Sequence, residues 1–296
     1  MRLFLVRHGE TVDNVAGVYA GTRDSPLTAH GVLQARRLGV HLASRSGSIG
    51  PVTHLFSSDL RRAVETAESI LAAQTQPAPL LPGTSGAAVA DGGADGTPNL
   101  KLVQLPELRE RDFGSAEGEK FGVSVTDAET REQMRTRVER FVKRHLAPLF
   151  EQHADTSASV VVVAHGLILD SLLRVLLARF GPAELVGEKR TAVWSNTGYV
   201  EAVIRIRSPS TTEVDEAEAS SSLAARAEAA TSGERTSQPR ITLAIVGVNM
   251  LKHLEGLKKT RGGIGSAQFD KRQRTVDSFF GPVSKKARVE PKSEET

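Results

Sequence analysis

The sequence predicts a three-layer α/β/α domain built on a mainly parallel sheet. Short apolar runs typical of buried strands alternate along the chain with segments that repeat apolar residues at helical spacing. The runs Leu3 to Val6 and Val160 to Ala164 are uninterrupted, as expected for strands covered on both faces. Each is followed within two residues by a His-Gly step. Ligands of α/β sheets usually bind at such carboxyl ends of strands.

The other elements follow from local patterns. Thr11 to Asp24 is polar and contains glycines, which is typical of a loop. Further strands are predicted over Val52 to Phe56, Tyr199 to Ile206 and Ile241 to Val246, and ordered structure is predicted to resume at Leu100 to Val103. Helices are predicted after the cap residue Thr28, after Ser57 to Asp59, from Met134 to Leu149, and after Gly166 through Leu177.

Two segments show neither the helical nor the strand periodicity of apolar residues. Residues 74–99 are rich in Ala, Gly, Pro, Ser and Thr, and residues 208–239 are polar and acidic. Both are predicted to be disordered insertions in a domain that spans residues 1–257. Residues 258–296 hold ten Lys or Arg and five Asp or Glu, so they are predicted to form a disordered basic tail.

Composition excludes several classes of protein. The 296 residues contain no cysteine, which excludes disulfides and thiolate metal sites. No apolar run reaches the roughly 20 residues of a membrane span, so we expect a soluble, intracellular chain without a membrane partner. The net charge of +3 comes from the tail, and a body near neutrality does not favour direct binding of nucleic acid.

Four separated blocks carry the candidate chemistry. They are Arg7-His8-Gly9-Glu10, the stretch from Ser58 through Arg62 to Ala67, Glu110 before Phe113-Gly114, and His165-Gly166. This set resembles the histidine phosphatase superfamily, whose fold is called phosphoglycerate mutase-like. The resemblance runs to about Leu254 and includes Asn14, Gly21-Thr22, Pro26-Leu27-Thr28 with Gly31, the turn Ser195 to Gly198, and the closing residues Val248-Asn249 and His253-Leu254.

The resemblance implies a role for each residue. His8 is expected to attack a phosphate monoester, and Arg7, Arg62 and His165 to hold the phosphoryl oxygens by charge-assisted hydrogen bonds. Glu110 is expected to protonate the leaving alcohol. Glu10 is expected to support the loop. Asn14, Gly21 and Thr22 are expected to bind substrate, a phosphorylated small molecule or phosphoprotein; no metal or other cofactor is expected.

Alternatives remain beside the phosphatase. A lone histidine is more often structural, which is the interpretation for His30, His41, His54, His145 and His153. Ala116 stands where the family often has a large side chain, and ten residues separate Gly118 from Glu129. Mutases of the family use a longer covering segment there, so hydrolysis is favoured over a phosphoglycerate-type mutase. A third possibility is a non-catalytic scaffold or phosphate-sensing protein.

The tail carries two further patterns. Gln273, Val276, Phe279 and Phe280 resemble the box by which proteins dock on the sliding clamp PCNA. Lys271-Arg272 and Lys285-Lys286-Ala287-Arg288 resemble a bipartite nuclear localisation signal, which implies a nuclear import receptor and a nuclear location, with the cytoplasm as a second location. The alternatives are phenylalanines packed on the body and a solvated basic tail.

Overall fold

The computed structural model describes residues 1–75, 100–182, 193–207, 240–260 and 263–270. The strands are β1 (Arg2–Arg7), β2 (Val52–Ser58), β3 (Leu102–Leu105), β4 (Ser159–Ala164), β5 (Tyr199–Arg207) and β6 (Arg240–Met250). The helices are α1 (Val12–Ala16), α2 (Ala29–Ser44), α3 (Ser46–Ile49), α4 (Arg61–Thr75), α5 (Arg131–Phe141), α6 (Ala147–His153) and α7 (Gly166–Phe180). None of these helices is long and apolar enough to span a bilayer.

The strands form one sheet in the order β3-β2-β4-β1-β5-β6. The first four in this order run parallel, and β5 and β6 are antiparallel to their neighbours. The prediction of a mainly parallel sheet is therefore confirmed. The carboxyl ends of β2, β4 and β1 lie next to one another, so residues that follow these three strands meet at one edge.

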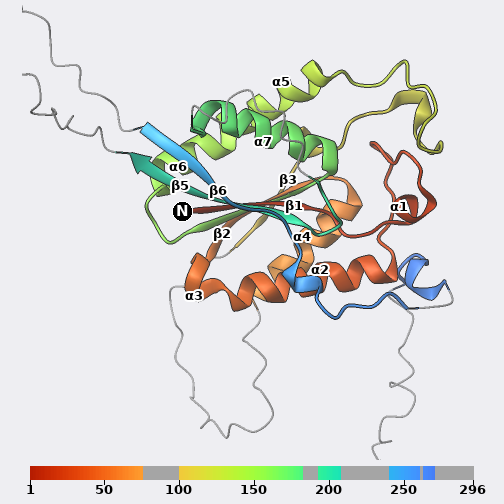
Figure 1. The fold of residues 1–296 in the computed structure, drawn as a ribbon, viewed down its shortest axis with the longest axis horizontal. Coiled ribbons are helices and arrows are strands. Elements are labelled where there is room, and N and C mark those ends of the chain that lie inside the picture. The colour runs from red at the N-terminus through yellow and green to blue at the C-terminus, as the bar shows by residue number, and fades with distance from the viewer. Residues whose placement is uncertain (76–99, 183–192, 208–239, 261–262, 271–296) are drawn as a thin grey trace, which may run out of the picture.

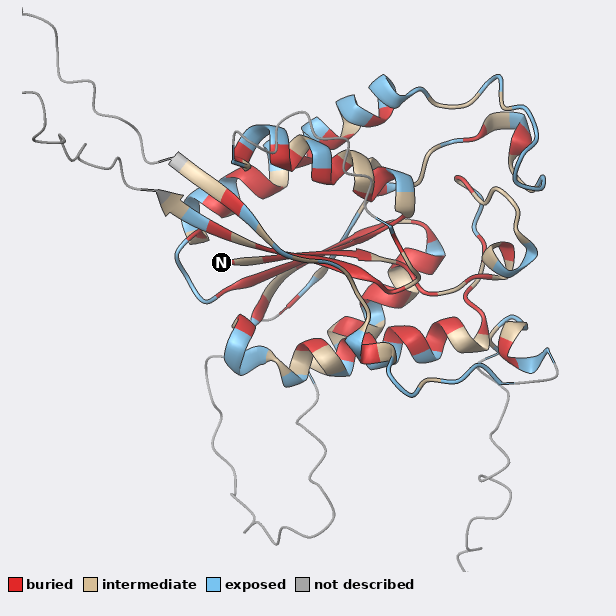
Figure 2. Cartoon of the chain, in the orientation of Figure 1, coloured by how far each residue is buried: buried red, intermediate tan, exposed pale blue. Residues whose placement is uncertain are grey.

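Helices cover both faces of the sheet, which gives the three layers visible in Figure 1. Because successive strand residues point to opposite faces, Leu3 and Leu5 of β1 pack with α5, α6 and α7, while Phe4 and Val6 pack with α2 and α4. Figure 2 shows the strands of the sheet mostly buried between the helices. This explains why β1 and β4 are apolar without alternation.

The predicted helix from Met134 to Leu149 is not continuous. A π-helical turn over Val142–Leu146 separates α5 from α6. Pro148 lies at the start of α6 and has no backbone N–H, so it cannot extend the regular ladder of hydrogen bonds. The extra residue in the turn rearranges that ladder just before the proline.

Residues after β6 remain attached to the body. The N–H of Phe269 donates to Leu27 O, and the N–H of Ala29 donates to Ala267 O. The Lys259 ammonium also pairs with Glu10 at 2.9 Å. The prediction placed the domain boundary after Leu257, and the structure continues these contacts to residue 269. Residues 271–296, nearly all of the first predicted insertion and the whole of the second lie outside the described residues.

Candidate active site

Three neighbouring strand ends bring His8, Arg62 and His165 together. His8 follows β1, His165 follows β4, and Arg62 lies in the first turn of α4, shortly after β2. The two imidazole rings lie 5.0 Å apart between centroids, and the Arg62 Nε donates to His165 Nδ1 at 3.1 Å. The residues that the sequence analysis selected from blocks more than 50 positions apart therefore share one site.

The imidazole of His8 has one nitrogen engaged and is almost completely buried. Its Nδ1 lies 2.7 Å from Gly9 O, a carbonyl that can only accept, so Nδ1 carries the proton of the neutral ring. Burial lowers the pKa of His8 well below its usual value, and the charges of Arg62 and Arg7 lower it further. Near neutral pH, His8 thus presents Nε2 with a free lone pair.

His165 has the opposite tautomer. Its Nδ1 accepts from Arg62, so in the neutral ring the proton resides on Nε2. Burial, followed by the charge of Arg62, also lowers the pKa of His165 well below its usual value. Within the described part of the chain, neither the His165 Nε2 nor the Arg7 Nε has a hydrogen-bond partner, although both are buried. Unpaired buried donors cost free energy, and an anion with several oxygens would satisfy them.

Arg62 is only 1% exposed and is held by backbone carbonyls. Its Nη1 donates to Arg23 O and its Nη2 to Gly21 O, each at 2.7 Å. Burial lowers the pKa of Arg62 to about 10, against opposing contributions from nearby carboxylates. The guanidinium therefore stays charged at neutral pH. Three of its five N–H bonds have partners, which leaves two for an anion.

The backbone around His8 is fixed by side chains from distant segments. The Gly9 N–H donates to Thr66 Oγ1 at 3.0 Å, and the Asn196 amide donates to His8 O at 3.2 Å. Thr197 adds its backbone N–H to the carbonyls of Arg7 and His8, from a left-handed backbone conformation with φ of 57°. The turn around Thr197 thus fixes the backbone of Arg7 and His8.

The side-chain carboxylate of Glu110 lies at the amino end of α7. Its Oε1 accepts from the backbone N–H groups of Arg111 at 2.9 Å and Ile168 at 3.1 Å, and its Oε2 accepts from that of Leu167 at 3.2 Å. Its Oε2 lies 3.9 Å from the position that a Cβ on Gly166, the residue after His165, would take. Burial lowers the pKa of Arg7, and the charge of the Glu110 carboxylate opposes that effect. The sequence-predicted acid therefore lies beside the cluster of His8, Arg7, Arg62 and His165.

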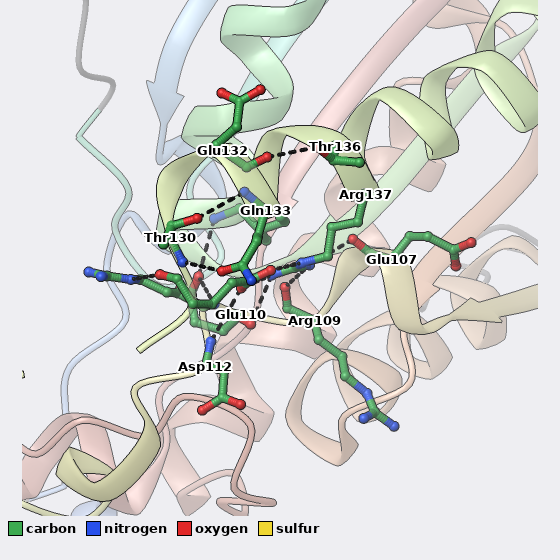
Figure 3. Close-up of polar contacts among 12 residues, drawn as sticks. Glu107, Arg109, Glu110, Asp112, Thr130, Glu132, Gln133, Thr136 and Arg137 are labelled. Carbon is green, nitrogen blue, oxygen red and sulfur yellow. Dashed lines mark hydrogen bonds and ion pairs between the residues drawn. The ribbon is translucent and has the colours of Figure 1, made fainter. Parts of the chain in front are cut away.

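A cavity of about 490 Å³ opens next to Glu110. Its lining is Thr22, Pro106, Arg109, Glu110, Asp112, Asp127, Ala128, Glu129, Gln133 and Arg137. Both arginines of the lining are paired: Arg109 with Asp59 at 2.7 Å, and Arg137 with Glu129 at 2.6 Å. Figure 3 shows the polar contacts among several of the lining residues, including Glu110 and Arg137. Four carboxylates against two paired arginines make the lining acidic.

The residues expected to bind substrate already have protein partners. Asn14 Oδ1 accepts from the Asn196 amide at 3.0 Å, and the Gly21 carbonyl accepts from Arg62. The Thr22 hydroxyl donates to Glu117, whose Oε1 also accepts from the Thr22 N–H at 2.6 Å. Thr22 still lines the cavity. Sequence analysis does not connect Glu117 with Thr22, because the two residues lie 95 positions apart in the chain.

The remaining predicted residues are Glu10 and those of the tail. Glu10 Oε1 accepts from the Thr28 hydroxyl at 2.9 Å and so supports the loop after His8. The tail residues Gln273, Val276, Phe279 and Phe280 lie outside the described residues. Across the described ranges, no group of three or more His, Asp or Glu side chains is placed to bind a metal ion.

The family of the chain follows from its similarity to known proteins. Residues 3–84 match the model of the histidine phosphatase superfamily, branch 1. An adenosylcobalamin/alpha-ribazole phosphatase of Salmonella typhi is 32% identical over 186 residues, which are 60% of this chain and 80% of that protein. The chain belongs to the histidine phosphatase superfamily. A protein of Schizosaccharomyces pombe named as a probable phosphatase is 27% identical over 95% of this chain and 80% of its own.

The superfamily contains more than one activity. Proteins named as probable phosphoglycerate mutases are also similar to this chain. Among solved structures, a mycobacterial hydrolase superimposes with a TM-score of 0.55 at 19% identity, over 84% of this chain and 99% of its own, which supports the shared fold alone. The relatives therefore support a phosphatase of this superfamily without identifying its substrate.

Proposed function

We propose that this protein hydrolyses phosphate monoesters through a phosphohistidine on His8. The observation that carries the proposal is the state of the His8 ring: Nδ1 is held by Gly9 O, which leaves Nε2 unprotonated beside buried donors without partners among the described residues. In the first step Nε2 forms a bond to phosphorus while the bond from phosphorus to the leaving oxygen breaks. Arg7, Arg62 and His165 stabilise the charge on the remaining oxygens.

Glu110 supplies and recovers the proton. Its Oε2 accepts one backbone N–H, which leaves a lone pair for a proton that passes to the leaving alkoxide. In the second step water attacks the phosphohistidine, Glu110 takes the proton of that water, and the bond from phosphorus to nitrogen breaks. Orthophosphate leaves, and both residues return to their starting states.

Trapping the intermediate tests the proposal. Enzyme mixed with a generic phosphomonoester and quenched in alkali should carry one phosphoryl group on His8 by mass spectrometry. His8→Ala should lose both label and turnover, and Glu110→Gln should slow turnover about 10² to 10⁴-fold. His145→Ala, a control on the π-helical turn, should behave as wild type. Full turnover in the His8 variant, or label on another side chain, would exclude the mechanism.

A mutase is the second candidate, because similar proteins carry that name. The acidic lining next to Glu110 argues against it, since a mutase must hold a second anionic group there, and both arginines of the lining are already paired. We expect release of orthophosphate without a bisphosphate primer. Transfer between phosphoglycerates that depends on such a primer would favour the mutase.

We also propose that the tail recruits the enzyme to PCNA in the nucleus. The support is the sequence pattern of Gln273, Val276, Phe279 and Phe280 with its basic flanks. A micromolar complex corresponds to about −8 kcal/mol, and buried aromatic anchors contribute about 2 kcal/mol or more each. Phe279→Ala with Phe280→Ala in the full chain should therefore abolish binding to immobilised PCNA, whereas Phe121→Ala on the body should not. Equal binding by both variants would refute recruitment.

Nuclear import is tested separately from clamp binding. A fluorescent fusion of the full chain should enter the nucleus, and replacing Lys285, Lys286 and Arg288 with alanine should leave it in the cytoplasm. A nuclear triple variant would show that these residues do not direct import. A non-catalytic scaffold would instead bind PCNA but form no phosphohistidine.

A further inference from the structure

The segment that carries Glu110 has no regular structure of its own. Residues 109–113 lie between the 3₁₀ turns Pro106–Leu108 and Gly114–Ala116. A proton donor must be held to within a fraction of an ångström, because a misplacement of about 1 Å costs about 10²-fold in rate. Contacts from outside the segment must therefore fix the backbone of Glu110.

Arg137 supplies most of these contacts from α5. Its Nη1 donates to Glu107 O at 2.8 Å and to Arg109 O at 2.6 Å, and its Nη2 donates to Glu110 O at 3.1 Å. One guanidinium thus binds three carbonyls of the segment, including that of the acid itself, as Figure 3 shows.

The remaining two N–H groups of Arg137 bind one carboxylate. Nε donates to Glu129 Oε1 at 2.6 Å, and Nη2 donates to Glu129 Oε2 at 2.8 Å. All five donors of the guanidinium are therefore used, and the side chain is only 16% exposed. Glu129 in turn donates its N–H to Asp112 O at 2.8 Å, and its own carbonyl accepts from Arg111 Nε at 2.8 Å. Arg137 and Glu129, which are paired with each other, together bind the backbone of Glu107, Arg109, Glu110 and Asp112.

We propose that Arg137 is a positioning residue for Glu110, required for proton transfer to the leaving group and not for attack by His8. The inference rests on the proposed function, in which Glu110 is the acid. With every donor engaged by protein, Arg137 has none left for substrate. A lysine at this position would keep the charge but could not reproduce the planar fork of five donors.

Loss of the hydrogen bonds from the Arg137 guanidinium should make the backbone of Glu110 more mobile without unfolding the protein. The Glu110 carboxyl keeps its bonds to Leu167 N and Ile168 N at the start of α7, so its side chain stays near the site. The carbonyls of Glu107, Arg109 and Glu110 lose their donor, and the segment relaxes. Proton transfer is then the step that suffers, because His8 and its donors lie on other elements.

Substrates with different leaving groups separate these effects. An alkyl phosphate releases a strongly basic alkoxide that needs a proton, whereas p-nitrophenyl phosphate releases a stable phenolate that does not. Because Glu110 also takes the proton of water in the second step, which is the same for both substrates, the comparison uses kcat/KM, which reports formation of the phosphohistidine. For Arg137→Lys we expect kcat/KM to fall about 10²-fold on the alkyl phosphate and only a few-fold on p-nitrophenyl phosphate. Glu110→Gln should show the same bias, and the double variant should be no slower than Glu110→Gln.

Arg135→Gln is the matched control, since Arg135 lies on the same helix, is 59% exposed and pairs with Glu139. It should match wild type on both substrates. Arg137→Lys should also form phosphohistidine from p-nitrophenyl phosphate as fast as wild type to within a few-fold. If Arg137→Lys does not fold, Glu129→Gln, which weakens two of the five bonds, should show a smaller bias of the same sign.

Equal losses of kcat/KM on the two substrates in the folded variant, or no loss of kcat/KM on either, would overturn the positioning role. In both cases a labelled His8 in the wild type would leave the proposed function intact. Absence of phosphohistidine in the wild type would instead remove the function on which the inference rests.

Discussion

Replacing Thr66 with valine isolates one hydrogen bond behind His8. Thr66 is fully buried on α4, and its hydroxyl accepts from the Gly9 N–H at 3.0 Å and donates to Arg62 O at 2.7 Å. Valine has nearly the same shape, so no cavity forms. The carbonyl of Arg62 keeps its helical partner, whereas the buried N–H of Gly9 loses its acceptor. The expected loss in the free energy of unfolding is about 1 to 3 kcal/mol.

Activity should fall with stability, because Gly9 directly follows His8 and its relaxation moves the imidazole. We expect kcat to fall about 10 to 100-fold, with KM nearly unchanged. Urea denaturation and steady-state kinetics measure both effects. Thr136→Val is the control: its hydroxyl makes the same kind of bond, to Glu132 O at 2.9 Å, on the exposed face of α5, so it should lie within about 0.5 kcal/mol of wild type. Equal unfolding midpoints for the two variants would refute the reasoning.

Two further predictions concern stability alone. Burial, aided by the charge of Arg62, holds the pKa of both His8 and His165 well below 6.5, so the unfolded chain binds protons that the folded chain does not. Stability should therefore fall below about pH 6.5, by about 1.4 kcal/mol per pH unit for each imidazole, and His165→Asn should reduce that slope in urea titrations. Glu201→Ala should cost about 3 to 5 kcal/mol in the free energy of unfolding, measured by urea denaturation, because it leaves Arg2 and Arg45 without their buried partner; kcat should not change.

The sequence was sufficient to predict the sheet and the catalytic candidates because both depend on short patterns. Apolar runs that end in His-Gly identify β1 and β4, and parallel pairing then brings His8 and His165 together, 5.0 Å between ring centroids. Neither inference requires knowledge of side-chain partners. Pro148 could also have predicted an interruption of the helix before it, because a proline inside a helix removes a backbone hydrogen bond and is tolerated only in the first turn, which is where it lies in α6.

Partners between distant segments could not be predicted in this way. Thr22 bonds to Glu117 across 95 positions, and Asn14 to Asn196 across 182. Both pairs use residue types that also commonly contact substrate, so the sequence alone does not reveal their partners within the protein. The role of Arg137 could not be predicted either. Its helix is rich in arginine, and nothing in the local sequence distinguishes Arg137 from Arg135. Only the three-dimensional structure shows that Arg137 lies next to three backbone carbonyls.

Burial of charged and polar groups makes the site reactive but lowers the free energy of unfolding, and bound orthophosphate should raise that free energy again. Holding the pKa of Arg62 at about 10 means that its surroundings disfavour the charge by about 3 kcal/mol. Two buried donors, the His165 Nε2 and the Arg7 Nε, also have no partner among the described residues. A phosphate dianion would pair with all three groups, so at 100 times its Kd it should raise the free energy of unfolding by about 2.7 kcal/mol. His165→Gln should shift this stabilisation to higher phosphate, and an unfolding midpoint insensitive to phosphate in the wild type would show that these donors do not form an anion site.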